Sequence, residues 1–193
     1  MNLTTQSGIQ KLMTKYEAFR KTLPYKSSEI EMSENCTGHH ILDSKNCQVC
    51  FDTTDTEDSK YLQYSVGQDK NDQDCSYLVD STISYENMSV VHSTHCLFND
   101  VIRRECENLY YCDNCFTSSN CFGCIGLRNK SYCILNRQYT KEEYESLLPK
   151  IIAHMTSSKE RGEFFPVTLS PFAYNETMAN EYFPLNKGEA IQR

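Results

Sequence analysis

Glycine and proline are scarce in this sequence of 193 residues, which contains 7 and 5 of them, respectively. Their scarcity excludes a collagen-like or a low-complexity chain, because both are rich in these residues. No run of apolar residues is long enough to cross a membrane, so we expect no membrane span. The first residues, MNLTTQ, lack the apolar core of a signal peptide. These absences predict a cytoplasmic protein.

Basic residues are also fewer than acidic ones. The chain has 19 basic and 26 acidic residues, which gives a net charge of -7. Binding to nucleic-acid phosphates needs clustered lysine and arginine, so we expect no nucleic-acid partner. The 13 tyrosines and 9 phenylalanines are too many for a disordered chain. The length suits one folded domain or at most two small ones.

Cysteine, in contrast, is abundant, with 11 copies that all lie between Cys36 and Cys133. An odd number cannot pair completely within one chain. Without a secretory leader, thiols are expected to be free or metal-bound rather than joined in disulfides. The cysteines thus mark one region of the chain and suggest a buried or metal-binding role there.

That region, residues 35–137, contains short apolar patches separated by polar stretches. The patches that begin at Cys47, Tyr61 and Cys75 are spaced by 14 residues, and later ones by 11 to 14. This weak repetition of short strands predicts a parallel β-solenoid with two or three patches in each coil. Cysteine is a small buried hydrophobe that suits a narrow interior. An antiparallel sandwich or barrel is the alternative, although the tight hairpin pairs Asn-Gly and Asp-Gly are missing.

Two amphipathic helices are expected to flank the solenoid. Residues 7–23 carry apolar side chains at helical spacing, a possible capping box at Ser7 and Gln10, and Pro24 directly after them. We expect this helix to cover the end of the core as a cap. Its opposite face is basic, so the alternative role of the helix is to bind a membrane surface or an acidic partner.

The second helix is predicted at residues 140–156, where Thr140 and Glu143 form a capping box and Pro149 introduces a kink. The aromatic and proline-rich tail that follows is expected to dock on the solenoid, because such an apolar segment needs a partner surface. The predicted domains are therefore 1–34 (N-terminal capping helix), 35–137 (cysteine-rich solenoid) and 138–193 (kinked helix and docked tail).

Two Cys-x-x-Cys pairs form the main candidate site. Four thiolates bind Zn²⁺ in a tetrahedron, and a Cys-x-x-Cys turn delivers two of them to one ion. The spacer of five residues between the pairs is shorter than in most zinc sites, and burial in the core is the competing interpretation. The candidate zinc ligands are Cys112, Cys115, Cys121 and Cys124.

Two other groups of residues are weaker candidates for a binding site. His92, His95 and Cys96 are close enough in sequence to share a metal, although no carboxylate accompanies them. Acidic residues precede two of the patches and would line one face if consecutive turns stack. Paired carboxylates on such a face could bind Ca²⁺ or act on glycosides. These acids are Asp52, Asp55, Glu57, Asp58, Asp69, Asp72 and Asp74.

A resemblance to a protein family rests on the C-terminal part of the chain. Segments 120–136 (NCFGCIGLRNKSYCILN) and 138–144 (QYTKEEY) resemble a group of uncharacterised cysteine-rich repeat proteins of candidate-phyla bacteria. The tail segments 162–166 (GEFFP), 170–177 (SPFAYNET) and 181–185 (EYFPL) are similar to the same group. Members carry more Cys-x-x-Cys repeats and an upstream zinc-ribbon-like region, which this chain lacks. The resemblance implies bacterial origin and no particular activity.

These observations favour a non-enzymatic structural or protein-interaction module. No phosphate-binding loop, dinucleotide-binding loop, nucleophile elbow or His-Glu-x-x-His motif is present. A protein partner or self-association would then account for the apolar surface of the helices and tail. The alternatives are a structural zinc protein and a carbohydrate-binding or carbohydrate-active β-helix.

Overall fold

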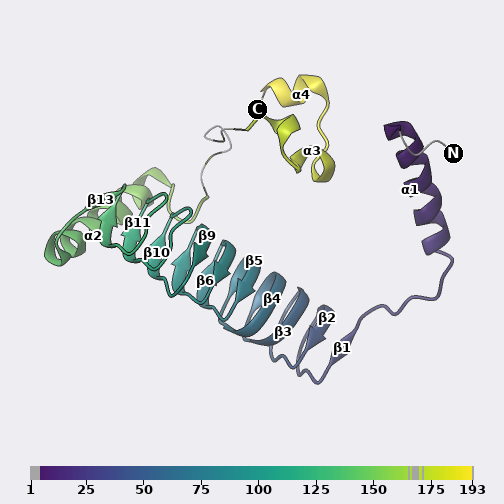
Figure 1. Cartoon of the computed structure of the whole chain (residues 1–193), viewed down its shortest axis with the longest axis horizontal. Coiled ribbons are helices and arrows are strands. Elements are labelled where there is room, and N and C mark those ends of the chain that lie inside the picture. Colours follow the sequence, from purple (N-terminus) through teal and green to yellow (C-terminus); the bar gives the residue numbers. More distant parts are fainter. Residues whose placement is uncertain (1–4, 165, 167–169, 171, 193) are drawn as a thin grey trace.

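The computed structural model describes residues 5–164, 166, 170 and 172–192. The predicted fold class is confirmed: the chain is mainly β, and a parallel β-solenoid of about nine turns is flanked by helices. Figure 1 shows the coils stacked in one row, with α1 beyond the first coil and α2 beside the last coils.

The strands pair with their equivalents in the next coils and are parallel, apart from the antiparallel pair β12–β13 at the C-terminal end. The strands are β1 (Ile30–Glu31), β2 (Gly38–Leu42), β3 (Cys50–Glu57), β4 (Lys60–Lys70), β5 (Gln73–Val79), β6 (Thr82–Tyr85), β7 (Met88–Val91), β8 (Thr94–Leu97), β9 (Asp100–Arg103), β10 (Glu107–Tyr110), β11 (Ser119–Phe122), β12 (Ser131–Ile134) and β13 (Arg137–Gln138).

Most coils contain 12 residues. Leu42 pairs with Thr54, Thr54 pairs with Val66, and Val79 pairs with Val91, each 12 positions further along the chain. The expectation of two or three patches in each coil was therefore wrong. Each coil holds roughly one patch, because one patch covers only the apolar part of a full turn.

Within a coil the repeating unit is a triplet. One residue in three is buried, and the residue before it is usually in the left-handed region, as at Asp52 (φ 54°), Asp55 (φ 55°) and Asp58 (φ 50°). Asparagine and aspartate tolerate this region better than other residues with a Cβ, which accounts for their frequency at this position. Four triplets complete a coil and bury four side chains in the narrow interior.

Two coils are one residue longer. The first extra residue lies at Gly67, where the pairing shifts from Thr54–Val66 to Thr56–Asp69. Gly67 has a φ of +111°, and a Cβ there would lie 2.4 Å from the Asp80 carboxylate, so only glycine fits. The second lies at Arg104 and Glu105, where two successive residues are left-handed.

The interior is richest in cysteine toward the C-terminal end and includes polar side chains along most of its length. Many interior polar side chains accept a hydrogen bond from a backbone N–H in the next coil, which satisfies both groups without water. Examples are Ser81 N to Asp69 (2.7 Å), Ser84 N to Asp72 (2.7 Å), Asn99 N to Asn87 (2.8 Å) and Cys112 N to Asn99 (2.7 Å).

Replacing Ile83 with asparagine should stabilise the solenoid by about 1 kcal/mol, because a β-branched residue is strained in the left-handed region. Ile83 has a φ of 57° and is 39% exposed, so little packing is lost. Asparagines at equivalent outer positions bond to one another, as Asn108 does to Asn120. Urea unfolding measures the effect. The control Thr82→Asn changes an extended neighbour, and equal gains from both variants would contradict the explanation.

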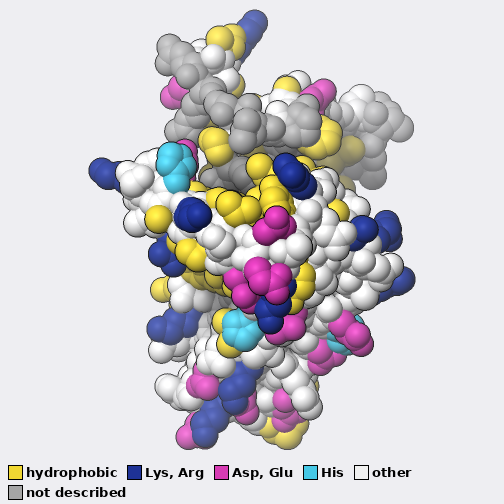
Figure 2. Space-filling model, turned by 90° about the vertical axis from the view of Figure 1, so that its left-hand side faces the viewer, with side chains coloured by type: hydrophobic (Ala, Val, Ile, Leu, Met, Phe, Trp, Pro, Cys, Tyr) yellow, Lys and Arg dark blue, Asp and Glu magenta, His cyan; other side chains and the backbone are white. Residues whose placement is uncertain are grey.

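Helix α2 (Lys141–Ser158) is confirmed as one helix with Pro149 inside it. Its predicted capping box is also confirmed, since Thr140 accepts from Glu143 N and Glu143 accepts from Thr140 N. The helix folds back along the last coils, because the Tyr144 ring lies 5.8 Å from Tyr132 and Gly162 N donates to the Tyr111 hydroxyl. Figure 2 looks onto this end of the molecule and shows hydrophobic side chains gathered among charged ones.

Helix α1 (Gln6–Arg20) is present, but its N-cap is Thr5 rather than Ser7. In this structure it flanks the solenoid without packing on the core. The apolar side chains remain largely exposed, at 53% for Tyr16 and 59% for Phe19, because an extended segment holds the helix beyond the first coil.

Docking of the tail on the solenoid stays a prediction, and the described end of the tail lies apart from the coils in this structure. Figure 1 places α3 (Ala179–Tyr182) and α4 (Lys187–Gln192) away from the coils, together with the 3-10 turn Tyr174–Glu176. Tyr182 is 71% exposed and Phe183 is 74% exposed. Tail residues 165, 167–169, 171 and 193 lie outside the described part of the chain.

Candidate functional site

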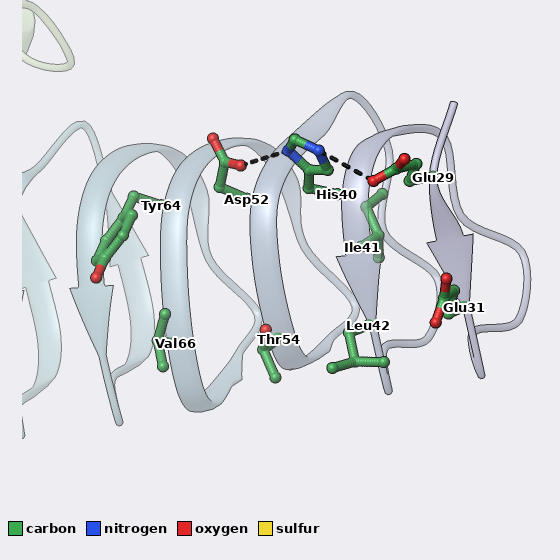
Figure 3. A pocket seen from close by; sticks show the side chains of 9 residues that line it. All are labelled: Glu29, Glu31, His40, Ile41, Leu42, Asp52, Thr54, Tyr64 and Val66. Atoms are coloured by element: carbon green, nitrogen blue, oxygen red, sulfur yellow. Dashed lines mark hydrogen bonds and ion pairs between the residues drawn. The ribbon is translucent and has the colours of Figure 1, made fainter. Parts of the chain in front are cut away.

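An open groove of about 360 Å³ lies on the N-terminal coils. It is formed where side chains of successive coils line up in two rows, one on each side (Figure 3). The triplet fold produces these rows, because each outward position repeats once in every coil. The lining residues are Glu29, Glu31, His40, Ile41, Leu42, Asp52, Thr54, Tyr64 and Val66.

One row is polar and aromatic. His40 lies between two carboxylates from the neighbouring coils, with Nε2 3.1 Å from Glu29 and Nδ1 2.9 Å from Asp52. The row continues with Tyr64 and Tyr77, whose rings stack with centroids 5.0 Å apart. All of these side chains are partly open to solvent. His40 therefore holds the Glu29 and Asp52 carboxylates in place. The Tyr64 and Tyr77 rings remain accessible to solvent.

The second row is a flat apolar strip. It consists of Leu42, Thr54, Val66, Val79 and Val91, each the register partner of the next. Glu31 pairs with Leu42 at one end of this row, and Arg103 pairs with Val91 at the other. We refer to the five residues from Leu42 to Val91 as the strip.

Acidic residues border the strip on its other side. Asp43, Asp55 and Asp80 each follow a strip residue directly in sequence and are exposed. Asp80 also pairs with His92 at 3.3 Å. Together with Asp52 and Glu29 across the groove, they give an apolar surface with acidic edges. Such a surface is complementary to a segment that is apolar on one face and basic at its flanks.

The cysteines predicted as zinc ligands all lie in the core. Each is at most 2% exposed, and all eleven cysteines of the chain are free. The structure brings the four close together: the Cys112 thiol neighbours those of Cys115 and Cys124, and the Cys121 thiol neighbours that of Cys124. Hydrogen bonding with the Cys112 and Cys121 thiols lowers the pKa of Cys124 to about 3. Hydrogen bonding with the Cys115 and Cys124 thiols raises the pKa of Cys112.

These four thiols do not form a ready-made metal site. Each thiol also lies against the backbone carbonyl two residues before it, as Cys112 does with Tyr110 at 3.4 Å. In the part of the chain that the structure describes, no group of three or more Cys, His, Asp or Glu side chains is arranged to hold a metal ion. Zinc binding would require the four thiols to turn toward one point.

Zinc binding by these cysteines stays a prediction, and metal analysis of protein purified under reducing conditions tests it. A zinc site predicts about one zinc per chain, with occupancy falling to a small fraction of that in Cys124→Ser, because three thiolates hold the ion less tightly than four. Cys75→Ser is a matched control, since Cys75 is a buried thiol of another coil. Much less than one zinc, with all thiols reactive in the unfolded chain, would reject the site.

The residues of the other two predicted sites, the histidine–cysteine set and the acidic set, do not come together in the structure. Cys96 points into the core, whereas His92 and His95 are exposed at left-handed positions. Of the acids, Asp69 and Asp72 are buried in the interior at 1% exposure, so they do not line a surface with Asp52, Asp55 and Asp58. The expected acidic face was wrong for these two, because the extra residue at Gly67 carries them into interior positions.

Sequence reasoning missed the groove and the strip. Their signal is the triplet pattern, which places Leu42, Thr54 and Val66 one step after a buried residue in successive coils. Among the described residues, no helix is long and apolar enough to cross a membrane. No family model and no curated protein matches the chain, so the resemblance to cysteine-rich repeat proteins stays a prediction.

Proposed function

We propose that this chain is a non-enzymatic interaction module whose strip binds a basic amphipathic helix of a partner protein. The observation that carries the proposal is the partly exposed in-register row from Leu42 to Val91 between acidic borders. A β-solenoid suits this role because stacked coils hold such a row rigid and in line.

The chemistry of the groove supports a helix rather than an added strand. The strip runs across the strands, from coil to coil, so its backbone groups are already paired within the solenoid. Affinity must then come from side chains: apolar burial against Val66 and Val79, and charge pairs with the acidic border. A helix with an apolar stripe flanked by lysine or arginine supplies both.

A peptide titration tests the proposal. The probe is an 18-residue amphipathic helix of leucine and lysine, and the same helix with glutamate in place of lysine is the control. We expect binding of the lysine peptide only, with weaker binding at high salt because the charge pairs are exposed. Val66→Ser/Val79→Ser should weaken binding of the lysine peptide at least about tenfold. The peptide would bury these two valine side chains, and their loss costs roughly 1.4 kcal/mol of binding free energy.

The acidic border is tested separately. Asp43→Asn/Asp55→Asn should also weaken binding, whereas Asp58→Asn, which lies on the next face, should not. Equal effects from all three positions would mean that the peptide only senses net charge, which contradicts the proposal. Binding of a neutral oligosaccharide in the groove, without peptide binding, would overturn the proposal in favour of a carbohydrate-binding module.

A further inference from the structure

Charge is strongly segregated along this chain. The first 28 residues contain Lys11, Lys15, Arg20, Lys21 and Lys26 against one acid, Glu17, which is a net charge of +4. Because the whole chain carries -7, the remaining residues carry -11. The only described helix in this basic segment is α1, so the chain contains one basic amphipathic helix of its own next to an acidic solenoid.

Helix α1 has an apolar face without a packing partner in the solenoid. Ile9, Leu12, Met13, Tyr16 and Phe19 follow helical spacing and are 39% to 59% exposed. Lys15 borders this stripe on the helix, and Lys11, one turn earlier, lies further round toward the polar face. The helix therefore has the features that the strip requires of its partner: an apolar stripe and a basic flank.

The dimensions of the helix and the strip agree. Fifteen helical residues span about 22 Å at 1.5 Å per residue. The strip crosses five coils, and four steps of about 4.8 Å span roughly 19 Å. The helix can thus cover the whole strip without passing far beyond its ends.

The segment that joins α1 to the solenoid begins near the strip and is long enough to let the helix reach it. Glu31 of β1 pairs with Leu42, so the chain enters the solenoid at the end of the strip itself. Residues 21–29 join α1 to β1, and a segment of nine residues reaches up to about 30 Å. This short tether keeps the helix at a high effective concentration near the strip.

At the C-terminal end of the solenoid, a helix already packs on a row of outward side chains. Helix α2 leaves the last coil and folds back over a row of outward side chains that includes Tyr110 and Phe122. Its residues Leu147, Leu148 and Ile151 are partly buried in that contact. The N-terminal helix has an equivalent position available over the strip.

We propose that α1 folds back onto the strip of its own solenoid and competes there with the partner helix. This inference rests on the proposed function, since it concerns the same surface. In the arrangement of Figure 1 the helix is released and the strip is open. In the closed arrangement Lys11 and Lys15 lie against Asp43, Asp55 and Asp80, and the strip is covered.

Carbodiimide cross-linking of the full chain detects the closed arrangement directly, because it joins lysine to a carboxylate only at contact distance. We expect peptides that link Lys11 or Lys15 to Asp43, Asp55 or Asp80, recovered from the monomer fraction. Leu12→Ser/Tyr16→Ser, two exposed changes, should remove most of this product. The control Gln10→Ser/Thr14→Ser alters the polar face and should leave it unchanged.

Competition is the second readout. In Leu12→Ser/Tyr16→Ser the affinity for the leucine–lysine peptide should rise about tenfold, as expected when a covered state that holds about nine-tenths of the molecules is removed. Cross-links without any peptide binding, even in this variant, would support the helix contact while rejecting the interaction function. Peptide binding that is the same in both chains, without cross-links, would reject the inference and leave the proposed function standing.

Three other results would also overturn the inference. One is a cross-link confined to a dimer fraction, which would place α1 on a second copy. Another is a product unchanged by Val66→Ser/Val79→Ser, which would show that the strip is not the docking surface. The third is binding of the full chain to anionic vesicles through Tyr16 and Phe19 with no cross-link, which would assign the helix to a membrane surface.

Discussion

Asp72→Asn is expected to stabilise the protein by roughly 2–5 kcal/mol at pH 8.5. Asp72 is 1% exposed in the middle of the core. Its Oδ1 accepts from Ser84 N at 2.7 Å, but its Oδ2 has no hydrogen-bond partner. A buried carboxylate in this position is costly, because its charge is desolvated without compensation.

The asparagine amide should relieve this cost. Asn87 and Asn99 occupy interior positions of the next coils, and each accepts a backbone N–H through Oδ1. Each also donates through Nδ2 to a backbone carbonyl, Cys96 O and Leu109 O, respectively. An asparagine at position 72 can keep the bond from Ser84 and supply a donor where Oδ2 now lacks a partner.

The effect should depend on pH in a defined direction. Burial raises the pKa of the Asp72 carboxyl to about 8, against about 3.9 when unfolded. The folded state therefore binds this proton more tightly, and the wild-type protein loses stability as pH rises from about 4 to about 8. Above pH 8 the penalty is constant, so the advantage of Asp72→Asn should grow from about 1 kcal/mol at pH 4.5 to its full value near pH 8.5.

Urea unfolding at the two pH values measures this difference. Asp55→Asn is the control, since it removes the same charge from an exposed position of the preceding coil. A gain that is equal at both pH values, or one that the control reproduces, would contradict a buried protonated carboxyl. Asp69, whose pKa burial also raises, remains in both proteins and should leave part of the pH dependence in place.

Leu109→Ala is expected to destabilise the protein by about 2–5 kcal/mol. Leu109 is fully buried and stacks between Cys96 of the coil before and Cys121 of the coil after. Its neighbours in this column are small, so they cannot fill the space that the leucine leaves. In a solenoid each coil is stabilised by its neighbours, and the loss should weaken both adjoining contacts.

Thermal unfolding with Leu135→Ala as the control tests this packing. Leu135 is 73% exposed, so its truncation should change stability by less than about 0.5 kcal/mol. A small loss for Leu109→Ala would mean that the core near the cysteines can collapse around the gap. Similar losses for both leucines would contradict the assignment of residue 109 to the interior.

Some features of this fold were accessible from the pattern of residues. Short apolar patches without helical period predicted a parallel solenoid, and Thr140 with Glu143 predicted the start of α2, because both signals are local. The placement of α1 was not accessible. A stripe such as Leu12, Tyr16 and Phe19 specifies an apolar face, but the same stripe fits a core, a groove or a membrane.

The candidate site illustrates the same limit. The contact of Cys112, Cys115, Cys121 and Cys124 follows from their spacing, since residues three apart occupy successive corners and residues 12 apart stack. Whether they converge on a metal depends on side-chain directions in the packed core. The groove depends on adding up coil lengths, so a wrong coil length conceals the alignment of Leu42, Thr54 and Val66.

By itself, the sequence determined the solenoid class, the cysteine-rich interior, the capped helix α2 and the opposite charges of the two parts of the chain. These properties depend on residue type and local spacing. Only the tertiary structure decided the 12-residue coil, the burial of Asp69 and Asp72, the partly exposed strip and the release of α1. Each of these depends on register accumulated across several coils, where a single extra residue at Gly67 moves every later side chain by one position.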